Sequence, residues 1–595
     1  MGSQRVLTEP GSGGNGGRRL TGALLLAALL SVAVALTPPG GEAQKRKKPK
    51  QPRPNIVLVM TDDQQADSVR FMPNVQQRLA GEGVTFTNSF VSYSLCCPSR
   101  ATLLTGQYAH NNGVRTNTPP SGGYSKLAPT MGNALPVWLQ RAGYSTAHIG
   151  KFLNGYGRTS PDTEVPPGWT EWYGALDDPD AHEGGTYTMY GYTLNENGAV
   201  VHYGSTPDVV DPATYQTDVY SAKAQDFIRR RAPSKKPFFL SVATLASHTE
   251  SGGACNCAGN NPRAAPRDEG TLAGEPLPRP PSYNEANVSD KPQAIRNRQP
   301  ITTPQQANIA ARYRAQLESL GAVDDMVGEL VRTVKGMGEL KNTVFIFTAD
   351  NGFFNGEHRI RNGKVQVYEP SVRVPLIIRG PDVPKGKRRT QPVVNADLAP
   401  TIVAFAGAKA GRLMDGRSLR KLIGDKRGER GRGLLLETFE NADEPEEDPE
   451  APPVNYQAVR TDRYLYARYG TGEQELYDMQ IDPFQLQNQS GNPIYAPAQS
   501  ALQRLLSGEA NCAGKSCRVL PKIKLKPRGC STAKVAGKGK PREATFFLRG
   551  KKFKRDPKPP IRARIPNRAF SGAKLEAVAT SLDGRKVTLE RKLRC

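Results

Sequence analysis

Residues 95–106 place several groups capable of nucleophilic chemistry within one short stretch. Cys96 and Cys97 supply thiols, and Arg100 supplies a permanent positive charge just ahead of a short apolar run. A nucleophile beside an arginine is typical of sites that attack an anionic substrate and hold its charge. By itself, this stretch predicts a cysteine nucleophile next to an anion-binding guanidinium.

Two pairs of oxygen-bearing side chains follow predicted buried strands. Asp62-Asp63 come directly after one continuous apolar run, and Asp350-Asn351 come directly after another. Ligands in open α/β sheets gather beyond the carboxyl ends of the strands, so the pairs converge if the strands are neighbours. Oxygen donors suit Ca²⁺ or Mg²⁺ rather than zinc. The alternative is two strand-ending turns, but the shared position of the pairs favours a metal site.

The elements that position these residues alternate between strands and helices. Apolar residues between 317 and 334 recur at three- and four-residue steps, which predicts one amphipathic helix. Such alternation predicts an α/β fold with a large, mainly parallel sheet flanked by helices. Residues 249–306 are polar and rich in proline and glycine, which indicates an irregular surface insertion. The predicted strands cover residues 55–60, 145–149, 238–246, 344–348 and 374–379.

The composition and the residue patterns of the sequence change along the chain and indicate five segments. Short alternating strands after residue 431 predict a smaller antiparallel subdomain, and the last 75 residues are rich in basic side chains and proline. The expected segments are a signal peptide at 1–43, a basic linker at 44–54, a catalytic domain at 55–430, an antiparallel C-terminal subdomain at 431–520, and a basic extension, β-rich or partly disordered, at 521–595.

The N-terminus predicts export. Arg18-Arg19 precede an apolar run over residues 20–36, and small residues follow it. This pattern is typical of a secretory signal. The alternative is a membrane anchor, for which the run is at the short limit. We expect a secreted protein, whether extracellular, on the cell surface or periplasmic.

Positive charge is concentrated in the appendages. The chain has a formal net charge of +25, and residues 521–595 hold 23 basic and 5 acidic side chains. Residues 45–54 add six basic side chains, so the body from 55 to 520 is close to neutral. Charge therefore gives no support for nucleic acid as a partner of the body. The extension either contacts a polyanion or an anionic surface, or is merely solvated.

Eight cysteines in an exported chain suggest disulfides. We expect Cys512 to pair with Cys517, and Cys530 to pair with Cys595. Cys255 and Cys257 lie one residue apart in a polar loop, where they could pair with each other, bind metal or stay free.

Together these motifs resemble the sulfatase family, whose fold is that of the alkaline-phosphatase superfamily. Cys96-x-Pro98-Ser99-Arg100 matches the family signature, and the two pairs of oxygen donors fall where the family places its metal ligands. The resemblance runs over residues 55–518. Residues 150–154 and 476–488 make it most similar to the glycan-sulfatase branch that includes the N-acetylglucosamine-6-sulfatases.

The resemblance implies that Cys96 is oxidised to formylglycine by a formylglycine-generating enzyme. A hydrated aldehyde carries two hydroxyls on one carbon, so one can attack sulfur and the other can expel sulfate by re-forming the aldehyde. The family pattern also implies a Ca²⁺ ion, with Mg²⁺ as the alternative. Its ligands would be Asp62, Asp63, Asp350, Asn351 and the modified Cys96.

The same resemblance assigns roles to the basic side chains. Arg100 would hold the aldehyde hydrate, and Lys151 and Lys364 would bind sulfate oxygens as negative charge grows on them. His248 would act near the leaving oxygen as a general acid or hydrogen-bond donor. His358 could contact substrate or could be a structural loop residue.

The expected function is hydrolysis of a sulfate ester, either in a sulfated glycan similar to N-acetylglucosamine-6-sulfate or in a small ester. One alternative is a phosphodiester or phosphonate hydrolase of the same superfamily, and another is a non-catalytic protein that binds sulfated glycans. The chain departs from the branch pattern at Leu153, at His110-Asn111-Asn112 and at Phe353-Phe354, which leaves the sugar open.

Overall fold

The structure is a computed structural model that describes residues 53–177, 185–250, 261–424, 431–439, 455–538, 540–566, 569 and 571–595. The predicted signal peptide, nearly all of the basic linker, Cys255 and Cys257 lie outside these residues. In the part of the chain that is described, no helix has both the length and the apolar character needed to span a bilayer.

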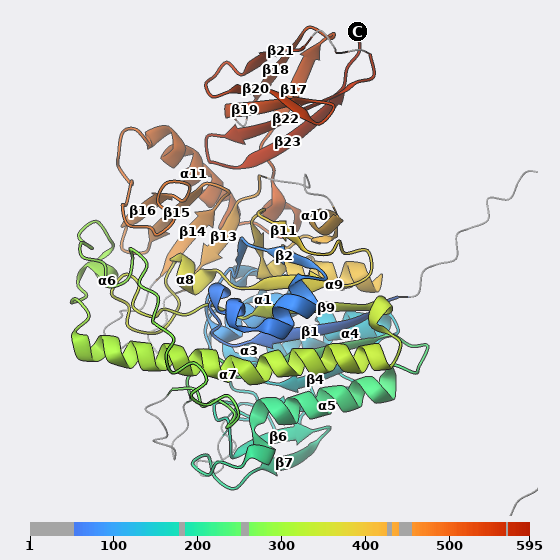
Figure 1. Cartoon of the computed structure of the whole chain (residues 1–595). Helices are drawn as coiled ribbons and strands as arrows, with labels where there is room; N and C mark the ends of the chain where they lie inside the picture. Colours follow the sequence, from blue (N-terminus) through green and yellow to red (C-terminus); the bar gives the residue numbers. More distant parts are fainter. Residues whose placement is uncertain are drawn as a thin grey trace, which may run out of the picture. The chain divides into compact units, whose positions relative to one another are not determined.

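A ten-stranded sheet forms the centre of the fold (Figure 1), in the order β11-β2-β10-β9-β1-β8-β4-β5-β6-β7. The central strands β9, β1, β8, β4 and β5 are parallel to one another, which confirms the predicted α/β class. The strands are β1 (Asn55–Thr61), β2 (Val84–Phe86), β4 (Ser145–Gly150), β5 (Glu171–Ala175), β6 (Tyr192–Glu196), β7 (Ala199–Tyr203), β8 (Phe238–Ala243), β9 (Thr343–Ala349), β10 (Leu376–Arg379) and β11 (Lys387–Arg389).

The sheet is mixed toward both edges. β10 runs antiparallel to β9 and β2, and β6 runs antiparallel to both β5 and β7. The β6–β7 connection is the two-residue turn Asn197-Gly198, and both residues have positive φ values, 56° and 97°. Such a tight turn joins only antiparallel strands, because a parallel pair needs a long crossover.

Helices cover both faces of the sheet. Ile56, Leu58 and Met60 of β1 contribute to one apolar cluster, and Val57 and Val59 contribute to the other. Burial on both faces explains why β1 is apolar at every position from Ile56 to Met60. The first cluster includes residues of α1 (Cys96–Thr105), α4 (Leu135–Arg141), α9 (Leu398–Ala406) and α10 (Arg420–Gly424), and the second includes residues of α5 (Gln216–Arg231) and α7 (Thr303–Gly336), which lie side by side in Figure 1.

Helix α7 begins before the predicted end of the insertion. The insertion was expected to reach residue 306, but the helix starts at Thr303. The backbone N–H of Thr302 donates to Gln305 Oε1 at 2.9 Å, and Pro304 lies in the first turn. Both features stabilise a helix start. The shorter elements are α2 (Ala109–Asn112), α3 (Gly123–Leu127), α6 (Gln293–Arg296), α8 (Glu369–Val372) and the paired strands β3 (Ser89–Phe90) and β12 (Val393–Val394).

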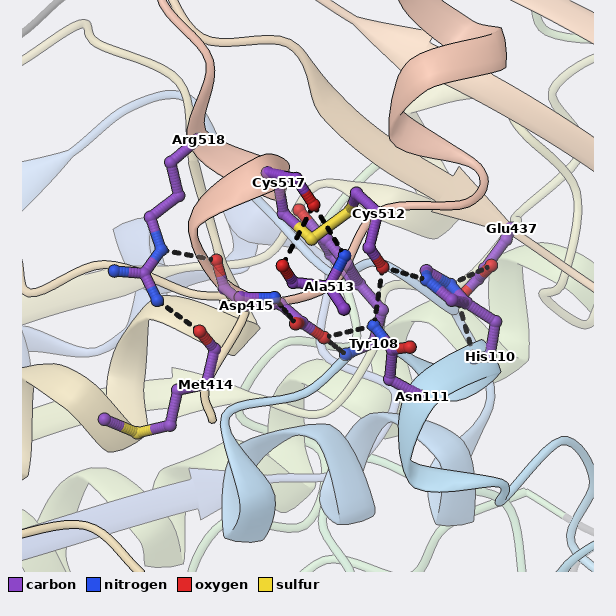
Figure 2. Close-up of a disulfide and its surroundings, with 12 residues drawn as sticks. Tyr108, His110, Asn111, Met414, Asp415, Glu437, Cys512, Ala513, Cys517 and Arg518 are labelled. Atoms are coloured by element: carbon purple, nitrogen blue, oxygen red, sulfur yellow. Dashed lines mark hydrogen bonds and ion pairs between the residues drawn. A yellow bond between two sulfur atoms is a disulfide. The ribbon is translucent and has the colours of Figure 1, made fainter. Parts of the chain in front are cut away.

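The next part of the chain forms a four-stranded antiparallel sheet, as the sequence predicts, and one helix, which was not predicted, packs against that sheet. The order is β13-β14-β15-β16, and the cystine Cys512–Cys517 follows the helix, which confirms that pairing (Figure 2). The elements are β13 (Leu434–Glu437), β14 (Tyr456–Arg460), β15 (Tyr464–Tyr469), β16 (Gln474–Asp478) and α11 (Ala496–Glu509).

The basic extension contains seven strands in two antiparallel sheets, β17-β18-β21 and β20-β19-β22-β23. Side chains from both sheets share one apolar cluster, and Cys530 and Cys595 form the predicted disulfide. The β-rich alternative for this segment is therefore confirmed. The strands are β17 (Ile523–Arg528), β18 (Thr532–Gly537), β19 (Pro541–Leu548), β20 (Lys551–Asp556), β21 (Arg562–Arg564), β22 (Lys574–Ser581) and β23 (Lys586–Lys592). The residue numbers of the segment boundaries stay predictions.

Candidate active site

The four predicted oxygen donors meet at one edge of the central sheet. β1 and β9 are parallel neighbours with Thr61 opposite Ala349, so Asp62 and Asp350 leave the sheet next to each other. The backbone N–H of Asp63 donates to Asp350 Oδ1 at 3.3 Å, and Asn351 Nδ2 donates to Asp63 Oδ1. All four side chains are at most 1% exposed. The structure thus brings both pairs into one buried cluster.

Helix α1 brings the cysteine and the arginine to this cluster. Cys96 is its first residue, and Arg100 lies one turn later on the same face. The arginine spans both acidic strand ends, with Nε 2.8 Å from Asp350 Oδ2 and Nη2 3.1 Å from Asp62 Oδ2. Its Nη1 also donates to the Lys151 carbonyl at 2.8 Å. Arg100 therefore joins α1 to the ends of β1, β9 and β4.

Two lysines point at the cysteine sulfur from different segments. Lys151 directly follows β4, and its Nζ lies 3.6 Å from Cys96 Sγ and forms an ion pair with Asp62. Lys364 lies in the loop after β9, and its Nζ lies 3.3 Å from Sγ and 2.6 Å from Asp63 Oδ1. Two ammonium groups therefore lie next to the buried sulfur atom of Cys96.

His248 reaches the cluster through one ring nitrogen. Its Nε2 lies 3.5 Å from Asp63 Oδ2, and its Nδ1 lies 2.6 Å from the Thr249 carbonyl oxygen. A carbonyl only accepts hydrogen bonds, so Nδ1 carries a proton and donates it. Nε2 is then the ring nitrogen that faces Asp63.

Burial and charge together determine the protonation of the cluster. Burial raises the pKa of Asp62, but Lys151, His248 and Arg100 outweigh it and hold that pKa far below its usual value. Burial lowers the pKa of Lys151, but Asp62 more than offsets this effect. Burial, followed by the charge of Asp62, raises the pKa of the Cys96 thiol. At neutral pH the lysine is thus cationic, the carboxylate is ionised and the thiol is protonated.

The donor set fits a hard cation. Metal-ligating atoms of Asp62, Asp63, Cys96 and His248 all lie within 4.8 Å of one another. Asn351 Oδ1 is buried and has no hydrogen-bond partner among the described residues, which is costly unless something else binds it. Carboxylate and amide oxygens are the ligands that Ca²⁺ and Mg²⁺ prefer.

His358 lies apart from this cluster. It is 1% exposed, its Nδ1 lies 2.7 Å from Glu285 Oε2, and its ring stacks on Tyr368 at 4.1 Å between centroids. Burial lowers its pKa more than Glu285 raises it. His358 also lines a cavity of about 450 Å³ bordered by Gln65, whose lining does not include Cys96. Among the described contacts, the structural alternative for His358 has more support.

Sequence reasoning missed two residues that hold the site together. The ring of Tyr187 lies 4.3 Å from Lys151 Nζ and 5.1 Å from the His248 ring. Asn395 Nδ2 donates to Ser99 Oγ at 3.0 Å. Neither residue belongs to a motif or follows a predicted strand, so only the fold reveals these contacts.

Two protein-family models match most of the chain. The sulfatase model matches residues 54–408, and the model of the N-sulphoglucosamine sulphohydrolase C-terminal region matches residues 356–511. Both matches end before the basic extension.

Individual relatives agree with the family models. An arylsulfatase of Volvox carteri is 32% identical and covers 80% of this chain and 77% of its own length. Human N-acetylglucosamine-6-sulfatase is 31% identical and covers 78% of this chain and 86% of its own length. A solved structure of a protein bound to its substrate, D-glucosamine-2-N,6-O-disulfate, has a TM-score of 0.63 at 24% identity and covers 76% of this chain and 97% of its own. That likeness concerns the fold. The chain therefore belongs to the sulfatase family and is a sulfuric-ester hydrolase.

Proposed function

We propose that this enzyme releases inorganic sulfate from sulfated carbohydrate, with substrates similar to N-acetylglucosamine-6-sulfate. The observation that carries this proposal is the surroundings of Cys96 Sγ. Lys364 Nζ lies 3.3 Å away, Lys151 Nζ lies 3.6 Å away and Asp62 Oδ1 lies 3.7 Å away. Two buried ammonium groups at one reacting atom suit the oxygens of a sulfate ester. The glycan part rests on the similarity to glucosamine sulfatases.

Formylglycine at Cys96, made by a formylglycine-generating enzyme, is part of the proposal. The intact signature and the protonated thiol support it, because a buried neutral thiol is a weak nucleophile. When present, the aldehyde hydrate supplies a hydroxyl nucleophile and a second hydroxyl that lets the site reset. Arg100, which lies on α1, orients the modified side chain at position 96. Lys151 and Lys364 hold the sulfate oxygens as the S–O bond breaks. His248 holds a proton at Nε2 for the leaving oxygen.

A Ca²⁺ ion, or Mg²⁺, is the second part of the proposal. Asp62, Asp63, Asp350 and Asn351 would hold it, and the unsatisfied Asn351 Oδ1 supports this assignment. When bound, the ion would polarise oxygens of the nucleophile and of the sulfate. Titration calorimetry on chelator-treated enzyme should detect Ca²⁺ binding that Asn351→Ala weakens. Unchanged Ca²⁺ affinity in that variant would remove Asn351 from the ligand set.

The function is tested with matched esters. Purified enzyme is given the 6-sulfate and the 6-phosphate of N-acetylglucosamine, together with small aryl sulfate and aryl phosphate esters, and released sulfate and phosphate are measured. We expect kcat/KM to be higher for each sulfate, and higher for the sugar 6-sulfate than for sulfates at other ring positions. Equal or greater phosphate turnover would favour the phosphodiester or phosphonate alternative.

We also propose that the protein is exported. The apolar run over residues 20–36 supports it, and the disulfides Cys512–Cys517 and Cys530–Cys595 are typical of an oxidising compartment. Terminal sequencing of the mature protein should find a start near residue 44. A mature chain that retains residues 20–36 would indicate an anchor instead.

A further inference from the structure

The outer face of the sheet β17-β18-β21 carries almost only positive charge. In β17, Ile523 and Leu525 point into the apolar cluster, while Lys524, Lys526 and Arg528 are exposed on the opposite face. The same alternation exposes cations in β18 and β21, where alanine and valine point inward. We call the outward cations of these three strands the cationic face: Lys524, Lys526, Arg528, Lys534, Arg562 and Arg564.

Strand register places these cations side by side. Lys526 lies opposite Lys534, and Lys534 lies opposite Arg562, so one row of three cations crosses the sheet. Neighbouring strands are about 4.8 Å apart, and every second residue along a strand is about 6.7 Å apart. The cationic face is therefore a flat lattice of charges, which suits a repeating polyanion better than one small anion.

Among the described residues, none of these six side chains has an ion pair or a side-chain hydrogen bond, and β17, β18 and β21 contain no acidic residue. Asp556, at the end of β20, lies beside the face: its Oδ2 accepts a hydrogen bond from the backbone N–H of Arg562 at 2.7 Å. The other sheet differs, because Arg555 pairs with Glu543 at 2.8 Å and Lys574 pairs with Glu590 at 2.5 Å. Like charges opposite each other destabilise a sheet, so the cationic face lowers stability in the absence of a ligand.

We propose that the cationic face binds a linear sulfated polysaccharide, and so raises the concentration of substrate near the catalytic site. This inference rests on the proposed function, which makes sulfated glycans the polyanions that the enzyme meets. The other outward positions of these strands include Thr532 and Ala536, and none is aromatic. A membrane-binding face usually offers large apolar side chains, and a face for single-stranded nucleic acid usually offers aromatic rings. A sulfated glycan needs neither.

The test uses the full chain with two matched triple variants. The first variant, Lys526→Gln/Lys534→Gln/Arg562→Gln, removes the central row of the cationic face. The control, Lys552→Gln/Lys554→Gln/Lys592→Gln, removes the same charge from exposed positions of the other sheet. Each is made in the active enzyme and in a Cys96→Ala background, which separates binding from turnover. Heparin is the probe, and polyphosphate and vesicles of phosphatidylserine and phosphatidylcholine are the competitors.

We expect the first variant to bind heparin about tenfold more weakly at 0.1 M salt, with a smaller salt dependence, and the control to change by less than about twofold. Turnover of a small aryl sulfate should stay unchanged in both variants. Equal losses in the two variants, no loss in the first, or tighter binding of polyphosphate or vesicles than of heparin would overturn the proposal.

Two further measurements keep folding and catalysis apart from binding. Lys526→Gln/Arg562→Gln should give an intermediate loss of heparin binding, and no variant should have a lower unfolding temperature than the wild type, because all the positions are exposed and because loss of the central row relieves repulsion between like charges. If the wild type releases no sulfate from any sugar while the Cys96→Ala enzyme still binds heparin through this face, the proposed function fails and the binding site stands.

Discussion

At the residue scale, the site depends on cations that are buried beside carboxylates. Arg100 is 2% exposed and reaches Asp62 and Asp350 at once, so each charge lost there would leave another uncompensated. Lys364 differs from Arg100, because its Nζ lies close both to Asp63 Oδ1 and to Cys96 Sγ. We therefore propose that the arginine organises the site and that the lysine acts on substrate.

Replacing Lys364 should affect turnover far more than folding. Lys364→Gln keeps a polar side chain, one atom shorter, but removes the charge that would stabilise sulfate oxygens, so kcat for a small aryl sulfate should fall by about 10²–10³. Steady-state kinetics measure this effect. Lys335→Gln, at an exposed position of α7, is the matched control and should stay within about twofold of wild type. If Lys364→Gln turns over as fast as that control, Lys364 has no part in the reaction.

At the element scale, α2 is tied to the C-terminal subdomain through His110 (Figure 2). His110 Nδ1 lies 2.9 Å from Glu437 Oε2, and His110 Nε2 lies 2.9 Å from the Cys512 carbonyl oxygen. Both partners accept hydrogen bonds, so only the doubly protonated ring satisfies them together. Burial lowers the pKa of His110, but Glu437 and the carbonyl outweigh it and raise that pKa above its usual value.

This geometry predicts a pH-dependent loss of stability in His110→Gln. A raised pKa in the folded state contributes stability below the pKa of the unfolded chain, and that contribution is lost as pH rises through the folded pKa. The variant should lose about 1.5–3 kcal/mol of unfolding free energy near pH 5, and less at pH 9. Urea unfolding across this range measures the difference. A difference that grows with pH would contradict the assignment.

Sequence patterns predicted the carboxyl ends of the central strands better than the antiparallel strands at the edge of the sheet. Asp62 and Asp350 could be predicted as site residues because each follows a buried strand with a continuous apolar run, and the change to polar side chains marks the end of that strand. The antiparallel edge was missed, although Asn197-Gly198 is a strong hairpin signal between alternating residues. Tyr187 and Asn395 could not be found, because they join the site through contacts between segments that are distant in sequence.

At the scale of the whole molecule, the two disulfides found among the described residues close loops of very different length. Cys512 and Cys517 are 5 residues apart, whereas Cys530 and Cys595 are 65 residues apart and enclose most of the basic extension. The chain-entropy model gives about 2 kcal/mol for the short loop and about 4 kcal/mol for the long one. The longer bridge therefore matters mainly for the stability of the extension.

Removing the longer bridge should separate the stability of the extension from catalysis. Cys530→Ser/Cys595→Ser should expose residues 521–595 to limited proteolysis, while kcat/KM for a small aryl sulfate stays within about twofold of wild type. Cys512→Ser/Cys517→Ser serves as the comparison, because its bridge lies beside His110 and Asp415 in the body (Figure 2). A matching loss of activity in the first variant would show that the active site depends on the extension.

We propose that Cys96 acts as formylglycine rather than as a thiol. Mass spectrometry of the peptide that contains Cys96, prepared from fully active enzyme, distinguishes the two. We expect a mass in which an aldehyde replaces the thiol side chain, and a loss of activity in proportion to any unmodified fraction. An unmodified thiol throughout fully active protein would refute the proposal.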